Sequence, residues 1–291
     1  MATLPRNKLG AAACVLLACA LLGAAPLPAG DPTIAQLRAD DLLLATVAHR
    51  LVVANAARCK DQMPATGLVI AAIDQYPPAL RAQARSELGF VYPVGIEAVV
   101  PGFAADRAGL RAGDGLLVIG DQVIAFMPRS AAANSASRDQ VERQLIALEP
   151  RAPIIIQVNR AGRSITATLE PVAACRSRFE VVPTDQLIAR SDRETIQLSS
   201  TFVERFGEEG MAVAFAHELA HLVLRHGTPA NKQAEREADL LSLHLLSAAG
   251  YDPNIAPHFW REHGASMGSR GHDSVKKRIS LLDAELATML R

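Results

Sequence analysis

Hydrophobic residues recur near helical spacing in the first part of the chain. From Thr33 to Arg58 they follow the pattern of one face of a helix. The sequence Tyr76-Pro77-Pro78 interrupts this pattern, and a short helical stretch follows it up to Arg85. We therefore expect residues 30–86 to form a helical N-terminal segment.

The pattern changes at residue 87 to short apolar runs separated by glycines and prolines. These runs predict strands at Leu88 to Tyr92, Gly95 to Val100, Gly115 to Ile119, Ile154 to Asn159 and Ser164 to Glu170. Helical spacing returns briefly from Ala104 to Leu110 and from Arg138 to Leu148. We expect residues 87–172 to form a separate β-domain.

Residues 176–291 have a mainly helical pattern. One strand is expected at Thr195 to Ser199, and Gly250-Tyr251-Asp252-Pro253 is a clear helix stop. The expected helices are Phe202 to Phe206, Glu208 to Arg225, Ala234 to Ala249, Ile255 to His263 and Ser274 to Leu290. The predicted fold class is therefore α+β, with a helix first, a β-domain next and a mainly helical domain last.

Residues 1–29 have the layout of a secretory signal peptide. Arg6 and Lys8 precede an apolar stretch from Leu9 to Leu22, and small residues and prolines follow. Cleavage is expected near Ala29, with lipid attachment at Cys19 or a retained anchor as the alternatives. No later stretch has the roughly 18 apolar residues that span a bilayer. We expect a protein exported to the periplasm or cell envelope, without a transmembrane span but with a lipid tether or peripheral membrane association as further options.

The charge balance argues against a nucleic-acid partner. The chain has 30 basic and 30 acidic residues, and no basic run is interleaved with aromatic residues. Neither DNA nor RNA is therefore an expected partner.

Two of the four cysteines fall inside the predicted signal peptide. Cys59 and Cys175 remain as the only pair in a chain that is expected to reach an oxidising compartment. A disulfide between them is predicted, with two buried free thiols as the alternative. Because these cysteines flank the β-domain, the bond would hold together the points where the chain enters and leaves it.

The sequence His217-Glu218-Leu219-Ala220-His221 is an HExxH motif within an apolar helical stretch. Residues four apart share one helix face, with Cβ atoms about 5 to 6 Å apart, so both imidazoles can bind one zinc ion. Glu218 is rotated off that face by one residue, where it can activate a water molecule. The motif predicts one catalytic Zn²⁺ per chain.

A third zinc ligand is required, and spacing limits the choice. A metzincin site would need histidine at Gly227, whereas His226 is one residue out of place. Glu235 opens a following predicted helix and can complete the site. Asp239 lies four residues further on, shares the face of Glu235 and can hold a ligand imidazole by its second ring nitrogen. We therefore expect Glu235 to join the two histidines as a metal ligand.

Further sequences within residues 176–291 match a known family. The matching sequences are His217-Glu218-Leu219-Ala220-His221, Glu235-Arg236-Glu237-Ala238-Asp239, Gly250-Tyr251-Asp252-Pro253, and His272 with Arg278. They resemble the gluzincin family of HtpX, BepA and the CAAX prenyl endopeptidases. In that family a His-Pro pair precedes an arginine by six residues, a spacing kept here although Asp273 replaces the proline.

The resemblance to this family implies roles for residues outside the metal site. His272 would stabilise the oxyanion or approach the zinc, and Arg278 would orient it; surface loop residues are the alternative. Thr195 to Ser199 would be the edge strand along which an extended substrate lies.

Short sequences within the β-domain also match a known module. They are Leu88-Gly89-Phe90, Val99-Val100-Pro101-Gly102, Ala108-Gly109-Leu110-Arg111-Ala112-Gly113-Asp114 and the turn at Ala161-Gly162. They resemble a PDZ domain of the bacterial periplasmic-protease type, which adds a peptide to a sheet edge beside a helix and binds its carboxylate with backbone N–H groups. The resemblance implies that Leu88, Gly89 and Phe90 form the carboxylate loop and that Arg138 to Leu148 is the groove helix. A domain whose groove is covered or unused is the alternative.

These features together predict a zinc-dependent endopeptidase that cleaves exported or misassembled cell-envelope proteins, with the PDZ domain selecting or regulating substrates. Zinc would polarise the scissile carbonyl and activate water, while Glu218 would take the proton and pass it to the leaving amine. The alternative is a PDZ-led binding or chaperone-like protein with a latent zinc site, which a fourth ligand such as His272 would produce. Protein or peptide substrates are the expected partners.

Overall fold

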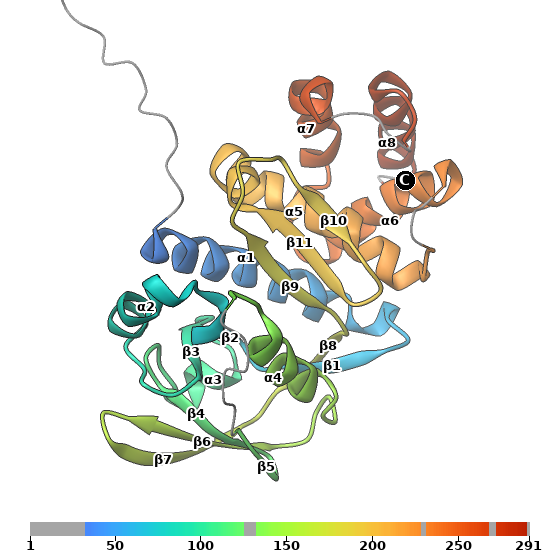
Figure 1. The fold of residues 1–291 in the computed structure, drawn as a ribbon. Helices are drawn as coiled ribbons and strands as arrows, with labels where there is room; N and C mark the ends of the chain where they lie inside the picture. The colour runs from blue at the N-terminus through green and yellow to red at the C-terminus, as the bar shows by residue number, and fades with distance from the viewer. Residues whose placement is uncertain (1–32, 125–131, 228–230, 268–271, 290–291) are drawn as a thin grey trace, which may run out of the picture. The chain divides into compact units, whose positions relative to one another are not determined.

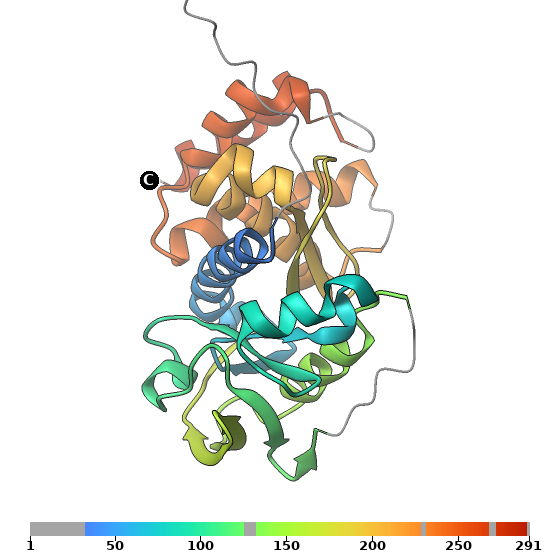
Figure 2. The ribbon, with the colours of Figure 1, turned by 60° about the vertical axis from the view of Figure 1, so that its left-hand side comes forward.

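The computed structural model describes residues 33–124, 132–227, 231–267 and 272–289 of the chain (Figures 1 and 2). The predicted signal peptide, including Cys19, lies outside the described residues, so its cleavage or lipidation stays a prediction. The described residues belong to one unit, Asp31–Arg291. They form α-helices and three separate β-sheets, and the fold class is α+β as predicted.

The helices and strands follow one another in three groups along the chain. The α-helices are α1 (Ile34–Ala54), α2 (Arg81–Leu88), α3 (Ala104–Arg107), α4 (Ala136–Ile146), α5 (Ser200–Leu224), α6 (Lys232–Ala248), α7 (Ile255–His263) and α8 (Val275–Met289). The strands are β1 (Gln62–Ala65), β2 (Leu68–Ala72), β3 (Val94–Val99), β4 (Gly115–Ile119), β5 (Gln122–Val123), β6 (Ile154–Arg160), β7 (Arg163–Leu169), β8 (Val172–Cys175), β9 (Arg178–Val182), β10 (Ala189–Ser191) and β11 (Thr195–Ser199). Short 3₁₀ turns are η1 (Ala56–Arg58), η2 (Ile73–Gln75), η3 (Pro78–Leu80) and η4 (Gly264–Ser266). The order is a long helix, a β-rich middle part and a mainly helical last part.

Helix α1 confirms the long helix predicted near the start of the chain. The side-chain oxygen of Thr33 accepts a hydrogen bond from the backbone N–H of Gln36 and so caps the first turn. Leu44 and Leu51 on the apolar face are buried. The helix contacts both α5 and β3, so it lies between the last part of the chain and the β-domain.

The chain enters and leaves the β-domain at one place. β1 pairs with β8 in an antiparallel two-stranded sheet, with Gln62 opposite Cys175. Cys59 and Cys175 form the predicted disulfide, and their Cα atoms are 5.3 Å apart. The bond and the strand pair therefore hold the two ends of the domain together.

The β-domain is built on a sheet with the strand order β2-β3-β4-β6-β7, and β5 pairs with β4. All neighbouring strands are antiparallel. Ile96, Leu116 and Ile156 come from three adjacent strands and are fully buried in the core of the domain. Helix α4 contacts β2, so the edge of this sheet lies next to a helix.

The strand predicted at Leu88 to Tyr92 is wrong. Leu88 is the last residue of α2, and Gly89 ends that helix in the left-handed conformation, with φ 77°. Leu88 and Phe90 are buried with Ile73 in a small core. Their apolar character therefore reflects a helix end packed in the interior. The sequence pattern also missed β1 and β2, which both lie in the segment expected to be helical.

A second sheet has the strand order β10-β11-β9, with β11 parallel to β9 and antiparallel to β10. The predicted strand Thr195–Ser199 is confirmed as β11. It lies in the middle of the sheet, so the expectation that it forms an exposed edge is wrong. The carboxylate of Asp192 accepts hydrogen bonds from the backbone N–H groups of Glu194 and Thr195, and this turn folds β10 onto β11. The outer strands of this sheet are therefore β10 and β9.

Helices α5 to α8 form the last part of the chain, and α5 packs against α6 (Figure 1). Two predicted helices correspond to α5, which is kinked between them at Gly207, with φ 58°. The other predicted helices of this part agree with α6, α7 and α8. Within the described ranges, no helix has both the length and the hydropathy that crossing a membrane requires.

Candidate metal centre

Helix α5 carries the HExxH motif in a buried setting. The ring of His217 lies one helical turn from that of His221, with the ring centroids 4.8 Å apart. Glu235 lies in the first turn of α6, and the side chain of Asn231 caps that turn by accepting hydrogen bonds from two backbone N–H groups. Since α5 packs against α6, the two histidines and the glutamate face one another.

Each of these three side chains contributes one donor atom to a nearly equilateral triangle. Nε2 of His217 lies 3.2 Å from Nε2 of His221 and 3.2 Å from Oε2 of Glu235. Nε2 of His221 lies 3.4 Å from the same oxygen. Tetrahedral zinc with bonds of about 2.0 to 2.1 Å holds its ligand atoms about 3.3 Å apart. The residues present therefore fit a tetrahedral metal ion.

A fourth side chain reaches the same place. Nδ1 of His272 lies 3.0 Å from Oε2 of Glu235. The donor atoms of His272, Glu235 and His217 all lie within 4.8 Å of one another. Among the described residues this buried Nδ1 has no partner with hydrogen-bond geometry. His272 is thus positioned to face either a metal ion or a substrate.

The surroundings of His217 favour positive charge at the site. Nδ1 of His217 lies 3.0 Å from Oδ1 of Asp239, behind the triangle. Burial lowers the pKa of His217, but hydrogen bonds to Asp239 and Glu235 raise it to about 9. Burial raises the pKa of Glu235, yet its contacts with the imidazoles bring that pKa well below its usual value. Groups that stabilise an imidazolium in this way also stabilise a bound cation.

Arg278 is buried on α8 and supports the same imidazole. Its Nε donates a hydrogen bond to Oδ1 of Asp239 at 2.8 Å, and its Nη2 lies 3.1 Å from Nδ1 of His217. The guanidinium also lies over the ring of Trp260, 3.6 Å from the ring centroid. These contacts place Arg278 behind His217, whereas the family resemblance implied that it orients His272.

Asp273, which stands where the family motif has proline, takes part in an ion pair with α6. Its carboxylate lies 2.6 Å from Nε of Arg236 and 3.4 Å from Nζ of Lys277. The hydrogen bond from Arg236 lowers the pKa of Asp273 to about 2. The ion pair holds the residue next to His272 against α6, in place of the backbone restriction that proline would impose.

Glu218 of the HExxH motif has a partner that the sequence did not indicate. Oγ of Ser191 donates a hydrogen bond to Oε2 of Glu218 at 2.6 Å. Ser191 is the last residue of β10, and β10 contacts α5. Because this contact depends on how the outer strand folds over the helix, no local sequence signal links residue 191 to residue 218.

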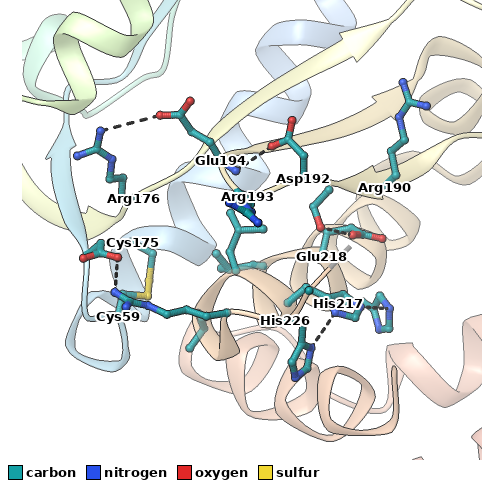
Figure 3. Close-up of a pocket in the computed structure, with 18 of the residues that line it drawn as sticks. Cys59, Cys175, Arg176, Arg190, Asp192, Arg193, Glu194, His217, Glu218 and His226 are labelled. Atoms are coloured by element: carbon teal, nitrogen blue, oxygen red, sulfur yellow. Dashed lines mark hydrogen bonds and ion pairs between the residues drawn. A yellow bond between two sulfur atoms is a disulfide. The ribbon is translucent and has the colours of Figure 1, made fainter. Parts of the chain in front are cut away.

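The site opens into a cavity of about 780 Å³. Residues of β10 and α5 line it together with the Cys59–Cys175 disulfide. Figure 3 shows the charged side chains of one wall, which are Arg190, Asp192, Arg193 and Glu194. The cavity therefore borders β10, an outer strand of the second sheet, and Glu218 lines it.

The tripeptide expected to bind a peptide carboxylate does not lie at the edge of the β-domain sheet. Leu88 and Phe90 are buried, and the N–H of Gly89 is bonded within the last turn of α2, at 3.0 Å. The edge strand β2 begins after Gly67, whose N–H donates a hydrogen bond to Nε2 of His49 at 3.2 Å. An edge strand beside a helix, the geometry that suits peptide addition, is thus found at β2 and α4.

Comparison with known proteins gives a weak relation to a peptidase. No family model matches the chain. Among curated proteins the chain is similar to the mitochondrial metalloendopeptidase OMA1 of Schizosaccharomyces pombe (strain 972 / ATCC 24843), with 29% identity. The match covers 26% of this chain and 36% of that protein, so the chain spans about a third of the relative's length. The chain is a weak homologue of a metalloendopeptidase.

Solved structures give partial likenesses. An HtrA-type protease AlgW with decapeptide is 23% identical, with 38% of this chain and 30% of that chain covered and a TM-score of 0.28. The HtrA3 PDZ domain bound to a phage-derived ligand is 15% identical, with 38% and 88% covered and a TM-score of 0.28. TM-scores at this level do not establish a common fold.

Proposed function

We propose that this protein is a zinc-dependent endopeptidase that hydrolyses peptide bonds in exported or misassembled cell-envelope proteins. The observation that carries the proposal is the triangle formed by donor atoms of His217, His221 and Glu235. Its sides match the separation of ligand atoms around tetrahedral zinc. Three protein ligands leave the fourth position open to water, as in catalytic zinc sites. The weak homology to a metalloendopeptidase points in the same direction.

Glu218 is the proposed general base. Bound zinc would polarise the scissile carbonyl and lower the pKa of the attacking water toward about 7. Glu218 would take the proton from this water and pass it to the leaving amine. Ser191 holds Oε2 of Glu218, so the other carboxylate oxygen can turn toward the water. His272 would stabilise the negative charge that develops on the carbonyl oxygen.

The outer strand β10 is the proposed substrate platform. One side of β10 pairs with β11, and Ala189, Arg190 and Ser191 of β10 line the cavity. An extended peptide can add to such a strand through main-chain hydrogen bonds. This arrangement would bring the scissile bond next to the carboxylate that Ser191 holds.

The proposed location is the periplasm or cell envelope, on the basis of the predicted signal peptide and the Cys59–Cys175 disulfide. The β-domain is proposed to act as a PDZ domain that selects substrates or regulates cleavage. Arg138 of the groove helix α4 forms an ion pair with Glu180 of β9, in the sheet that also contains β10. Binding beside α4 could therefore act on the catalytic cavity through this sheet.

A second candidate is a PDZ-led binding or chaperone-like protein with a latent zinc site. The observation that favours it is the position of His272, whose Nδ1 lies 3.0 Å from Oε2 of Glu235. If His272 filled the fourth position, no place for water would remain. His272→Ala would then create peptidase activity, whereas it would lower activity if His272 stabilises the oxyanion.

The variant Glu218→Gln tests the proposed mechanism. We expect kcat on an unfolded protein substrate to fall by roughly 10² to 10⁴, because a general base is lost, while the zinc content stays that of the wild type. Glu209→Gln is the matched control, since Glu209 lies on the same helix and is exposed. Cleavage by Glu218→Gln at the wild-type rate would exclude this base, and a wild-type protein that binds no zinc would exclude the metal site.

A further inference from the structure

His226 lies just beyond the end of α5 and folds back onto the helix. Arg225 ends the helix in the left-handed conformation, with φ 56°. The backbone N–H of His226 then donates to the carbonyl of His221 at 3.0 Å. The helix end therefore returns the side chain of residue 226 toward the second histidine of the HExxH motif.

The side chains of His226 and His221 are in direct contact. Their Nδ1 atoms lie 2.9 Å apart, and the ring centroids are 5.0 Å apart. On its other side, Nε2 of His226 lies 3.1 Å from Oε2 of Glu237. The side chain of His226 is only 10% exposed, whereas that of Glu237 is 47% exposed. A largely buried imidazole thus connects His221 to a carboxylate at the surface.

The hydrogens of this chain of contacts can be assigned without a charged imidazole. If Nε2 of His221 faces the metal, its hydrogen lies on Nδ1 and is donated to Nδ1 of His226. A neutral His226 carries a single ring hydrogen. Because its Nδ1 accepts from His221, this hydrogen lies on Nε2 and is donated to Glu237. Each N–H group has an acceptor, so two neutral imidazoles and one carboxylate satisfy one another.

The other histidine of the motif, His217, also has a carboxylate that engages its second ring nitrogen. Nδ1 of His217 lies 3.0 Å from Oδ1 of Asp239, which is a direct carboxylate contact. For His221, the carboxylate of Glu237 acts through an intervening imidazole. Both histidines therefore have their second ring nitrogen engaged on the side away from the triangle of donor atoms.

We propose that His226, supported by Glu237, is a positioning residue that fixes the ring orientation and tautomer of His221 for metal binding. This inference rests on the proposed zinc-dependent function. Nδ1 of His226 meets the ring nitrogen of His221 that points away from the triangle, so His226 acts through His221. Loss of a partner of this kind lowers metal affinity by roughly 10- to 100-fold.

Zinc affinity, measured by competition with a colorimetric chelator, tests this role in the full chain. His226→Leu removes the acceptor, and we expect the dissociation constant for zinc to rise by roughly 10- to 100-fold. His226→Asn keeps an acceptor oxygen close to the position of Nδ1, and we expect most of the affinity to return. Glu237→Gln should have a smaller effect on zinc affinity, because this carboxylate is half exposed and contacts His226 rather than His221.

His244→Leu is the matched control. His244 forms an equivalent contact with Glu285, 2.7 Å from Nε2 to Oε1, on another part of α6. Its loss should leave zinc affinity unchanged, and thermal melts of all variants show whether they fold. An unchanged dissociation constant in His226→Leu, or an equal loss in His244→Leu, would overturn the positioning role while wild-type zinc binding still supported the peptidase. Absence of zinc binding by the wild type would overturn both.

Discussion

Nε2 of His49 accepts a hydrogen bond from the backbone N–H of Gly67 at 3.2 Å and so joins α1 to the start of the edge strand β2. Nδ1 of His49 lies 2.9 Å from the carbonyl of Ala45 and carries the hydrogen, which leaves the lone pair of Nε2 for Gly67. The rings of Phe103 and Phe179 flank the imidazole. A backbone N–H group at the end of the sheet edge is thus occupied by the chain itself.

The contact between His49 and Gly67 predicts how the β-domain responds to peptides. A peptide that uses the N–H of Gly67 must first displace the imidazole, which costs about 1 kcal/mol. We therefore expect His49→Ala to bind peptides with a free C-terminal carboxylate roughly fivefold more tightly than the wild type, as measured by fluorescence anisotropy. His244→Ala serves as the control. Equal or weaker binding by His49→Ala would show that this N–H is not part of a peptide site.

Burial of His49 also predicts a pH dependence of stability. Burial lowers its pKa from 6.5 to about 4, so between these values the unfolded chain binds a proton that the folded chain does not. The free energy of unfolding should fall by roughly 3 kcal/mol as the pH drops from 6.5 to 4, and this group should contribute little pH dependence well above 6.5. Urea titrations of the wild type and of His49→Gln measure the effect. If the free energy of unfolding changed with pH in the same way in both proteins, the prediction would be contradicted.

The hydrogen bond from Ser191 to Glu218 predicts a contribution to catalysis. A hydrogen bond to a charged group contributes about 1.5 kcal/mol, so Ser191→Ala should lower kcat roughly tenfold. The zinc content should stay constant, because Ser191 lies outside the triangle of donor atoms. Ser191→Thr keeps the hydroxyl and should retain most of the activity. Unchanged turnover in Ser191→Ala would show that the outer strand does not position the base.

The Cys59–Cys175 disulfide predicts a large effect of reduction. The cysteines are 116 residues apart, and closing a loop of this length contributes about 4 to 5 kcal/mol to the free energy of unfolding. Thermal melts with and without reductant should therefore differ strongly for the wild type. The double variant Cys59→Ser with Cys175→Ser should melt like the reduced wild type and should not respond to reductant. A wild-type melting temperature insensitive to complete reduction would contradict this expectation.

Much of the candidate site was predictable because it depends on spacing within helices. The interval between His217 and His221 places both on one face, and that between Glu235 and Asp239 does the same on the next helix. Ser191 was not predictable, because its contact with the base requires the pairing of β10 with β11. The contact of His226 with His221 was not predictable either, because the return of the chain to the helix depends on Arg225, a left-handed residue other than glycine.

The β-domain shows where a sequence pattern is ambiguous. The pattern of Leu88-Gly89-Phe90 is compatible with the start of a strand and with an apolar helix end. In the structure it is a helix end, because the left-handed Gly89 terminates α2. The strand β2 was missed because it is a short, continuous apolar run. Such a run shows neither the alternation of a half-buried strand nor the spacing of an amphipathic helix. Its place at the edge of the sheet is set by pairing with β3, a contact between segments that are distant in the sequence.

Because β1 pairs with β8 beside the disulfide, the chain enters and leaves the β-domain at the same point. The β-domain is therefore a loop inserted into the rest of the protein, with its two ends held together. The entropic cost of such a loop grows only logarithmically, by about 0.6 kcal/mol for each doubling of its length. Evolution or protein engineering could therefore exchange this insert for modules of very different size and recognition properties while the helices that hold the metal keep their arrangement.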